Sequence, residues 1–367
     1  MTRLKLVPFA ASIGLATTFL LSLAACSPDS GATANGNAPT GNTDTAGGTP
    51  APQTDLMVGI VFDKGGRGDQ SFNDSAWRGI QRAEKELGIE VKAVDSKTDA
   101  DYSTNIRAMA EAECDLVIGI GYAMKNAIDE VAKDFPETKF ALVDERAEPS
   151  NVRSILFKEE EGSFLAGYLA AKVSKTKKIG FVGGKDGDLI RKFYAGYAAG
   201  AKYANNGVTV LPPKFTDDWD NQDFAKAAAN VLYGNGADII YHAAGRAGLG
   251  VIAAAEEKDL LAIGVDSNQD HISKGHVLTS MIKRVDEAVF QTVKDVQSNM
   301  FSGGVKVFDL KSNGVGLSEF EFTKEMVTPE IQAGLDAIRE KIVSGELKVP
   351  ATDADLAAFS ATEAAAN

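Results

Sequence analysis

Short apolar runs alternate with amphipathic helical stretches along the chain from about residue 57 onward. Near-continuous apolar runs of this length are typical of strands that are buried on both faces of a sheet. In the stretch that ends at Leu87, Trp77, Ile80 and Ala83 recur at helical spacing, with charged residues between them, which predicts one buried face. The predicted strands are 57–62, 90–95, 115–121, 139–144 and 152–157, followed by 178–184, 208–211, 238–244, 260–266 and 276–282.

Two series of strands separated by helices predict two similar α/β lobes, each built on a parallel sheet. The expected fold class is therefore α/β, with two doubly wound parallel-sheet lobes joined by a hinge that closes over a ligand. A helix at 284–301 is expected to return the chain to the first lobe, and another is predicted at 329–344. We place lobe one at 55–157 plus about 284–310 and lobe two at 158–283, and we leave 311–367 without a lobe.

The first 26 residues have the layout of a secretory signal peptide. Arg3 and Lys5 precede an apolar run, and small residues then lead to Cys26. The ending Leu-Ala-Ala-Cys resembles the lipobox of bacterial lipoproteins, in which the cysteine is lipidated and becomes the mature N-terminus. We therefore expect a cell-envelope protein that is anchored by lipid to a membrane outside the cytoplasm. The alternative is an uncleaved transmembrane anchor.

Residues 27–54 contain no Leu, Ile, Val, Met or aromatic residue. A segment of this composition cannot bury enough apolar surface to offset its chain entropy, so we predict a flexible tether. As a random coil it would reach roughly 30 Å on average.

Net charge and cysteine content narrow the choice of partners. When Arg3 and Lys5 are set aside, 36 basic and 51 acidic side chains remain, a net charge of −15. A surface of this charge repels nucleic acid and anionic lipid, so neither is expected as a direct partner. Cys114 opens an apolar run and is expected to be a buried thiol. The three histidines show no metal-binding spacing with cysteines or acids, and we predict neither a metal nor a cofactor.

Among the acids that end or directly follow predicted strands, we single out three, namely Asp63 and Asp144 in lobe one and Asp266 in lobe two. In open α/β sheets, ligands bind at the carboxyl ends of the strands. Each acid taken alone is equally well explained as a helix cap or turn former. Because the three come from both lobes, we interpret them as parts of one binding cleft.

The loop after the first strand, 62–77, is rich in glycine and leads into a helix. Ser71 and Asp74 fit a capping box that would start this helix. Phe72 and Asn73 would then lie in its first turn, where Phe72 can cover a flat ligand and Asn73 offers both a donor and an acceptor. The alternative for Phe72 is packing between the loop and the helix.

Four segments together resemble the basic membrane protein family of bacterial lipoproteins: the loop FDKGGRGDQSFND, GIGYAM (119–124), HAAGRAG (242–248) and IGVDSNQ (263–269). The resemblance covers about residues 57–283. It implies a type I periplasmic-binding-protein fold and a receptor that delivers purine nucleosides, such as adenosine, guanosine or inosine, to an ABC-type permease.

The resemblance also implies a set of ligand-binding residues. Asp63 and Asp144 would bind the base beside Asn73, Phe72 and Phe193 would stack on it, Asp266 and Lys283 would bind the ribose, and Gly245 would let the backbone approach. For Phe193 the alternative is core packing on its helix. Neither Trp77 nor Trp219 lies in a position that matches the family.

Three other functions are alternatives to a nucleoside receptor. A receptor for a sugar or a flavin-like heterocycle would use similar carboxylates and aromatic rings. A nucleoside hydrolase could also use clustered acids at strand ends, although such enzymes usually bind a metal through them, and we predict no enzyme. A transcription regulator of this fold would need a DNA-binding headpiece where this chain has its signal and tether.

Overall fold

The computed structural model describes residues 54–204 and 207–359. The predicted signal peptide, Cys26 and nearly all of the tether lie outside these described residues.

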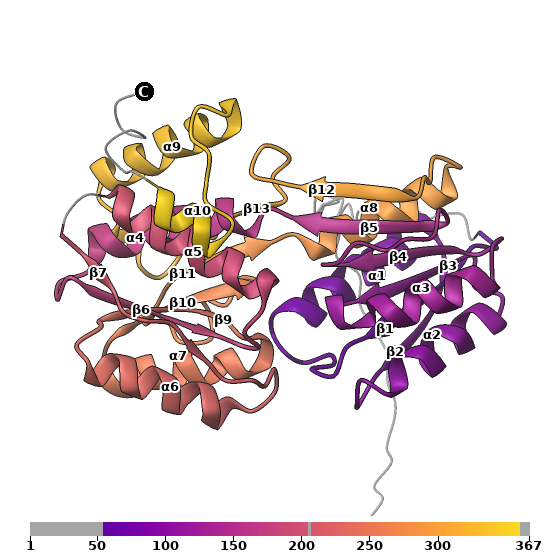
Figure 1. Cartoon of the computed structure of the whole chain (residues 1–367), viewed down its shortest axis with the longest axis horizontal. Helices are drawn as coiled ribbons and strands as arrows, with labels where there is room; N and C mark the ends of the chain where they lie inside the picture. Colours follow the sequence, from indigo (N-terminus) through magenta and orange to yellow (C-terminus); the bar gives the residue numbers. More distant parts are fainter. Residues whose placement is uncertain (1–53, 205–206, 360–367) are drawn as a thin grey trace, which may run out of the picture. The chain divides into compact units, whose positions relative to one another are not determined.

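The first sheet is entirely parallel, with the strand order β12-β5-β4-β3-β1-β2. Helices α2 and α3 cover one of its faces and α1 and α8 the other (Figure 1). Side chains alternate accordingly, since Ile60 packs toward α1 whereas Val61 packs toward α2 and α3. We call this sheet and these four helices lobe one. Its elements are β1 (Met57–Phe62), α1 (Phe72–Leu87), β2 (Glu90–Asp95), α2 (Asp101–Glu111), β3 (Leu116–Ile120), η1 (Tyr122–Met124), α3 (Lys125–Asp134), β4 (Lys139–Val143), β5 (Val152–Phe157), α8 (Val285–Gln297) and β12 (Gly304–Phe308).

The second sheet has the order β13-β11-β10-β9-β6-β7, with β8 also paired to β6 and only β13 antiparallel to its neighbour. Helices α6 and α7 pack on one face and α4 and α5 on the other (Figure 1). Helix α9 packs on α4, and α10 packs on α5. We call these elements lobe two. They are α4 (Glu159–Val173), β6 (Lys178–Gly183), α5 (Asp188–Tyr203), β7 (Thr209–Val210), β8 (Lys214–Phe215), α6 (Gln222–Gly234), β9 (Ile239–Ala243), η2 (Gly245–Gly248), α7 (Leu249–Lys258), β10 (Leu261–Asp266), β11 (Val277–Lys283), β13 (Val315–Leu317), η3 (Lys324–Met326), α9 (Pro329–Ser344) and α10 (Asp353–Ala358).

The predicted fold class is confirmed, because both sheets are parallel apart from β13 and both are covered by helices. Every predicted strand is present with limits that differ by at most one residue at either end, and the helix predicted at 329–344 has the predicted limits. The helix predicted at 284–301 ends earlier, at Gln297. Three strands were missed. Of these, β12 is an edge strand whose Val305 and Val307 are 45% and 46% exposed, so its sequence lacks the signature of a buried strand.

Within the described residues, the chain passes between the two sheets three times. It leaves the first sheet after β5, returns after β11 to form α8 and β12, and crosses again through residues 309–314 to β13. After the third crossing, the described part of the segment that begins at residue 311 packs on lobe two. The sequence alone had assigned this segment to neither lobe. The residue limits that we gave to the two lobes stay a prediction.

None of the helices in residues 54–204 and 207–359 is both long enough and apolar enough to span a bilayer.

Helices α4 and α5 approach each other through glycines, and this contact sets the position of the pocket-facing helix α5. A Cβ atom on Gly167 would lie 1.9 Å from the carbonyl oxygen of Tyr197, and one on Gly200 would lie 2.0 Å from that of Phe164. Both neighbours are helix backbone, which cannot move aside as a flexible side chain can. The glycines therefore fix the separation of the two helices.

We predict that Gly167→Ala lowers the free energy of unfolding by about 1–3 kcal/mol, because the added methyl group forces α4 and α5 apart. Urea titration followed by circular dichroism measures the change. Gly234→Ala is the matched control, since a Cβ atom there meets nothing within 4 Å at the end of α6. The control should be neutral or slightly stabilising. Equal stability of the two variants would contradict the close-packing argument.

Candidate ligand-binding site

A pocket of about 570 Å³, including the space at its open side, lies between the two lobes. The structure brings all eight residues that the sequence predicted for ligand binding into the lining of this one pocket. They are Asp63, Phe72, Asn73, Asp144, Phe193, Gly245, Asp266 and Lys283. Their contact with a ligand stays a prediction.

Lys283, at the end of β11, is almost completely buried at 1% exposure and sits among acids and aromatic rings. Its Nζ lies 2.6 Å from Oδ2 of Asp144 in lobe one and 3.2 Å from Oε1 of Glu159, the first residue of α4. The same ammonium lies 5.2, 5.0 and 5.7 Å from the ring centroids of Phe72, Phe157 and Phe193. A buried cation needs such partners, and this set ties both lobes to one charge.

On the lobe-one side, Asn73 and Asp63 form a hydrogen-bonded pair. The amide nitrogen of Asn73 donates to Oδ1 of Asp63 at 2.8 Å and to Oδ2 of Asp69 at 3.1 Å. Oδ1 of Asp63 also accepts from the backbone N–H of Gly65 at 3.0 Å. Asp63 and Asn73 are therefore held in fixed orientations at the wall of the pocket.

The predicted capping box at Ser71 and Asp74 is wrong. Ser71 makes no side-chain capping bond, and the carboxylate of Asp69 instead accepts from the backbone N–H groups of Ser71, Asn73 and Asp74 at 2.9, 2.8 and 3.0 Å. Asp74 accepts from the N–H groups of the preceding loop. A carboxylate satisfies several of the free N–H groups at a helix start, which a serine hydroxyl cannot do. The hydroxyl of Ser71 is thus available elsewhere.

Ser71 uses its hydroxyl to join lobe one to lobe two. Its Oγ donates to Oδ2 of Asp266 at 2.7 Å, and the hydroxyl of Ser267 donates to the carbonyl oxygen of Ser71 at 2.6 Å. Nearby, Arg246 of lobe two donates to the carbonyl oxygens of Gly65 and Arg67 in the glycine-rich loop, at 2.9 and 3.0 Å. These bonds hold the loop and the start of α1 against the carboxyl ends of β9 and β10.

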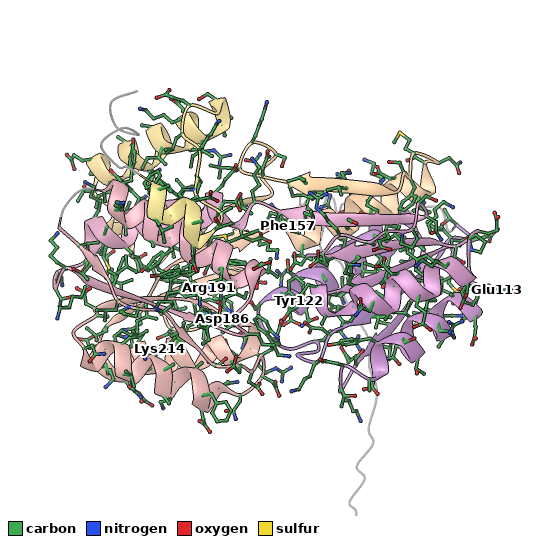
Figure 2. The ribbon with its side chains drawn as sticks, in the orientation of Figure 1. Glu113, Tyr122, Phe157, Asp186, Arg191 and Lys214 are labelled. Atoms are coloured by element: carbon green, nitrogen blue, oxygen red, sulfur yellow. The ribbon has the colours of Figure 1, made fainter. Side chains whose placement is uncertain are left out.

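Aromatic and aliphatic side chains provide the apolar part of the lining. Phe72 comes from α1 and Phe193 from α5, so the two rings belong to different lobes. Tyr122 and Trp219 also line the pocket, with their ring centroids 6.5 Å apart and nearly perpendicular. Figure 2 shows Tyr122 on the side of lobe one that faces lobe two, and Phe157 where the chain leaves β5.

Ten lining residues, Trp219 among them, are not among those that the sequence predicted. Tyr122 and Arg246 lie inside segments that carried the family resemblance, so their position after a strand end was an available signal. Trp219 follows the two-residue strand β8, and a strand so short has no readable pattern. These ten residues are Gly65, Asp69, Gly121, Tyr122, Leu189, Ile190, Trp219, Ala243, Arg246 and Val265.

Two of the strand-end acids have unusual backbone conformations. Asp144 has a φ of 74° and Asp266 a φ of 63°, in the left-handed region that only a small fraction of non-glycine residues adopt. Gly245 is also left-handed, with a φ of 55°, and a Cβ atom there would lie 3.3 Å from the carbonyl oxygen of Trp219. Strain of this kind is found where a structure fixes side chains for binding.

Burial dominates the electrostatics of the pocket acids. It raises the pKa of Asp266 to about 7, partly opposed by Lys283, and the pKa of Asp63 to about 6, partly opposed by the hydrogen bond from Asn73. Burial also raises the pKa of Asp144 to about 6, against the attraction of Lys283. For Lys283, burial alone would lower the pKa, but Asp144, Glu159 and Asp266 raise it overall. The ammonium is therefore charged at any physiological pH.

Other candidate chemistry falls outside this pocket. Cys114 is buried, as predicted, and burial raises the pKa of its thiol. Burial lowers the pKa of His242 to about 4, so its ring is neutral at physiological pH. In the part of the chain that the structure describes, no group of three or more His, Cys, Asp or Glu side chains is arranged to hold a metal ion.

Comparison with known proteins gives consistent results. Residues 56–353 match the profile of the Bmp family, described as ABC transporter substrate-binding protein PnrA-like. The chain is 38% identical over 331 residues to the CD4+ T-cell-stimulating antigen of Listeria innocua, covering 84% of this chain and 91% of that protein. It is 33% identical over 330 residues to the ABC transporter nucleoside-binding protein BmpA of Lactococcus lactis, covering 84% and 92%. A solute-binding protein of an ABC transporter system from Aeropyrum pernix has a similar structure, with a TM-score of 0.77, 28% identity and coverage of 83% and 96%.

We predict that the protein without ligand becomes more stable as the pH falls from about 8 to about 6. An acid whose pKa is raised on folding binds its proton more tightly in the folded state, so stability increases as the pH falls through the folded pKa. Asp266, with a pKa of about 7, contributes most of this change among the pocket acids. His242 has the opposite effect on stability. Because burial lowers its pKa, it favours the unfolded state once the pH falls below the pKa that the side chain has in the unfolded chain.

Thermal unfolding at several pH values measures this effect, with Asp266→Asn as the comparison. The variant cannot bind the extra proton, so the rise of its melting temperature toward about pH 6 should be smaller than in the wild type. Identical pH profiles for the two proteins would show that Asp266 has an ordinary pKa in the folded state.

Proposed function

The chain belongs to the family of PnrA-like ABC transporter substrate-binding proteins, and we propose that it binds purine nucleosides in the pocket between its lobes. The observation that supports this proposal most directly is the convergence of eight predicted residues, from both lobes, on one pocket. The Lactococcus lactis relative, which is named as a nucleoside-binding protein, supports the same ligand class.

The chemistry of the lining suits a flat base that carries a ribose. Phe72 and Phe193 offer apolar faces from opposite lobes, and Asp63, Asn73 and Asp144 offer acceptors to the polar edge of a base. Asp266 lines the same pocket, and in this proposal it accepts hydrogen bonds from the ribose hydroxyls. Although Ser71 occupies one acceptor site of its Oδ2, an ionised carboxylate has about four such sites, so room for a ligand remains.

Closure of the lobes would complete such a site, because its residues come from both of them. Ser71 and Arg246 form bonds between the lobes at the edge of the pocket, so binding and closure would be coupled. We propose that the closed complex is the form that docks on an ABC-type permease, with the protein held at the membrane by lipid on Cys26. The family consists of transporter binding components, not of enzymes.

We predict that Asp266→Ala weakens nucleoside binding by about tenfold or more, because it removes charge-assisted hydrogen bonds worth about 1.5–3 kcal/mol each. The free base should lose much less affinity, since it has no ribose. A 2′-deoxynucleoside should bind the wild type poorly, and its affinity should differ little between the wild type and the variant. Titration calorimetry with nucleoside, deoxynucleoside and base at about pH 8 measures all three.

Ser71→Ala separates the two roles of Asp266. This variant removes the bond between the lobes and leaves the carboxylate in place, so it should weaken nucleoside, deoxynucleoside and base by a similar factor. If Asp266→Ala also weakened all three ligands equally, the carboxylate would be part of the closure contact only, and the ribose assignment would be wrong.

We predict that Cys26→Ser prevents lipidation and releases the protein from membranes without changing its affinity for ligand. The segment 27–54 contains no large apolar residue through which the anchor could be coupled to the pocket. Detergent-free fractionation of cells and metabolic labelling with a radioactive fatty acid measure the two effects. Membrane association of the variant at the wild-type level would rule out the lipid anchor.

A further inference from the structure

The lobe-one wall of the pocket presents hydrogen-bond acceptors. Asn73 uses its amide nitrogen for Asp63 and Asp69, at 2.8 and 3.1 Å, so both amide hydrogens are engaged and the orientation of the amide is determined. Its Oδ1 is consequently left to accept. Asp63 has its Oδ1 occupied by Asn73 and by the N–H of Gly65, which leaves Oδ2 as a further acceptor.

Two acceptor atoms of residues in this wall are buried and have no hydrogen-bond partner among the described residues of the protein. They are Oδ1 of Asn73 and Oδ1 of Asp144, and both residues are at least nine-tenths buried. A buried acceptor without a hydrogen bond costs about 1–3 kcal/mol, and more when it is charged. Both residues line the pocket, so a ligand that supplies hydrogens to these atoms would remove the penalty.

The charged donors beside the pocket, Lys283 and Arg246, are partly paired with protein acceptors, although Nε of Arg246 has no hydrogen-bond partner. Lys283 is held by Asp144 at 2.6 Å and by Glu159 at 3.2 Å. Arg246 donates to the carbonyl oxygens of Gly65 and Arg67 and lies 3.1 Å from the carboxylate of Asp220. The wall formed by Asp63, Asn73 and Asp144 thus has more capacity to accept hydrogens from a ligand than to donate them.

We propose that this wall selects purine nucleosides whose base edge consists of donors, so that 2-amino-6-oxopurines of the guanosine type bind in preference to 6-aminopurines of the adenosine type. The inference rests on the proposed function and names the ligand within it. Guanine presents the N1–H and the 2-amino hydrogens side by side, three hydrogens in all, to the acceptors of Asp63, Asn73 and Asp144. Hypoxanthine has the N1–H alone.

Adenine meets the same wall with a mismatch. Its N1 is a lone pair, which would lie against acceptor oxygens in a partly desolvated site. Sites built around particular hydrogen bonds discriminate strongly against analogues that leave their buried polar groups unpaired. The three carboxylates of Asp63, Asp69 and Asp144, together with Asp266, also disfavour an anionic ligand, so nucleotides should be excluded.

Calorimetric titration at about pH 8 tests the order of affinities. We expect guanosine to bind most tightly, inosine less tightly, and adenosine about tenfold or more below guanosine. Methylation of N1 should weaken guanosine by a similar factor. Adenosine binding as tightly as guanosine would overturn this inference and leave a nucleoside receptor in place. Binding of none of the nucleosides would instead refute the proposed function.

Asp63→Asn is the variant that should shift the preference. Its side-chain oxygen can keep the bonds from Asn73 and Gly65, and its amide nitrogen then offers a donor in place of the acceptor Oδ2 of a residue that lines the pocket. Guanosine should lose affinity and adenosine should not. The dissociation constant of adenosine divided by that of guanosine should therefore fall about tenfold. An equal loss for both ligands would show that Asp63 is scaffold and contradict the proposal.

Asp95→Asn is the matched control. Asp95 ends the neighbouring strand β2, pairs with Arg67 and does not line the pocket, so the ratio should stay at the wild-type value. A shift in the control as large as in Asp63→Asn would also contradict the proposal.

Titration of the wild-type protein gives a test that needs no variant. Burial raises the pKa of Asp63 and of Asp144 to about 6 each. The groups that modify this effect are Asn73, Asp69, Gly65 and Asp144 for Asp63, and Lys283, Glu159 and Lys192 for Asp144. As the pH falls from about 7.5 to about 5.5, protonation turns carboxylate acceptors into donors, so the preference for guanosine over adenosine should narrow. A preference that widens toward low pH would contradict the acceptor-wall argument.

Discussion

The buried ammonium of Lys283 is the interaction on which the pocket depends. It joins Asp144 of lobe one to Glu159 at the start of α4, and it lies near the rings of Phe72, Phe157 and Phe193, which come from three different elements. Removing a charge from water costs several kcal/mol unless its partners are in place. The positions of β4, β5, α1, α4 and α5 are therefore constrained together, and so is the shape of the site between them.

A second constraint is that two different residues at the start of α1 cap the helix and join the lobes. Asp69 accepts from three backbone N–H groups there, which leaves the hydroxyl of Ser71 to donate to Asp266 in the other lobe. One residue satisfies the helix end and another joins the lobes. Because Phe72 and Asn73 follow directly, the same turn that is fixed by Asp69 also orients the pocket wall. Local capping and closure of the lobes are thus connected through adjacent residues.

Several features of the pocket lower the stability of the folded protein when no ligand is bound. Its carboxylates have raised pKa values because burial disfavours their charged forms, and two of its acceptors have no partner within the protein. Asp144 and Asp266 also hold left-handed backbone conformations. Features that break local rules in this way are expected at binding sites, where a ligand supplies the missing interactions. The surrounding core, which consists of regular three-layer packing in each lobe, provides the stability that offsets them.

The sequence by itself determined ten of the thirteen strands in the described residues, their order in two series, and the three acids at strand ends, because buried parallel strands have apolar runs whose limits can be read directly. The resemblance to a family added Phe193, Lys283 and Gly245. Only the tertiary structure decided that Trp219 lines the pocket, that Asp69 and not Ser71 caps α1, and that β12 and β13 belong to different sheets. The reason is physical. A strand that is buried on both faces leaves a continuous apolar run in the sequence. A loop residue such as Trp219, a carboxylate with several possible donors, or an exposed edge strand is instead placed by contacts with segments far away in the chain.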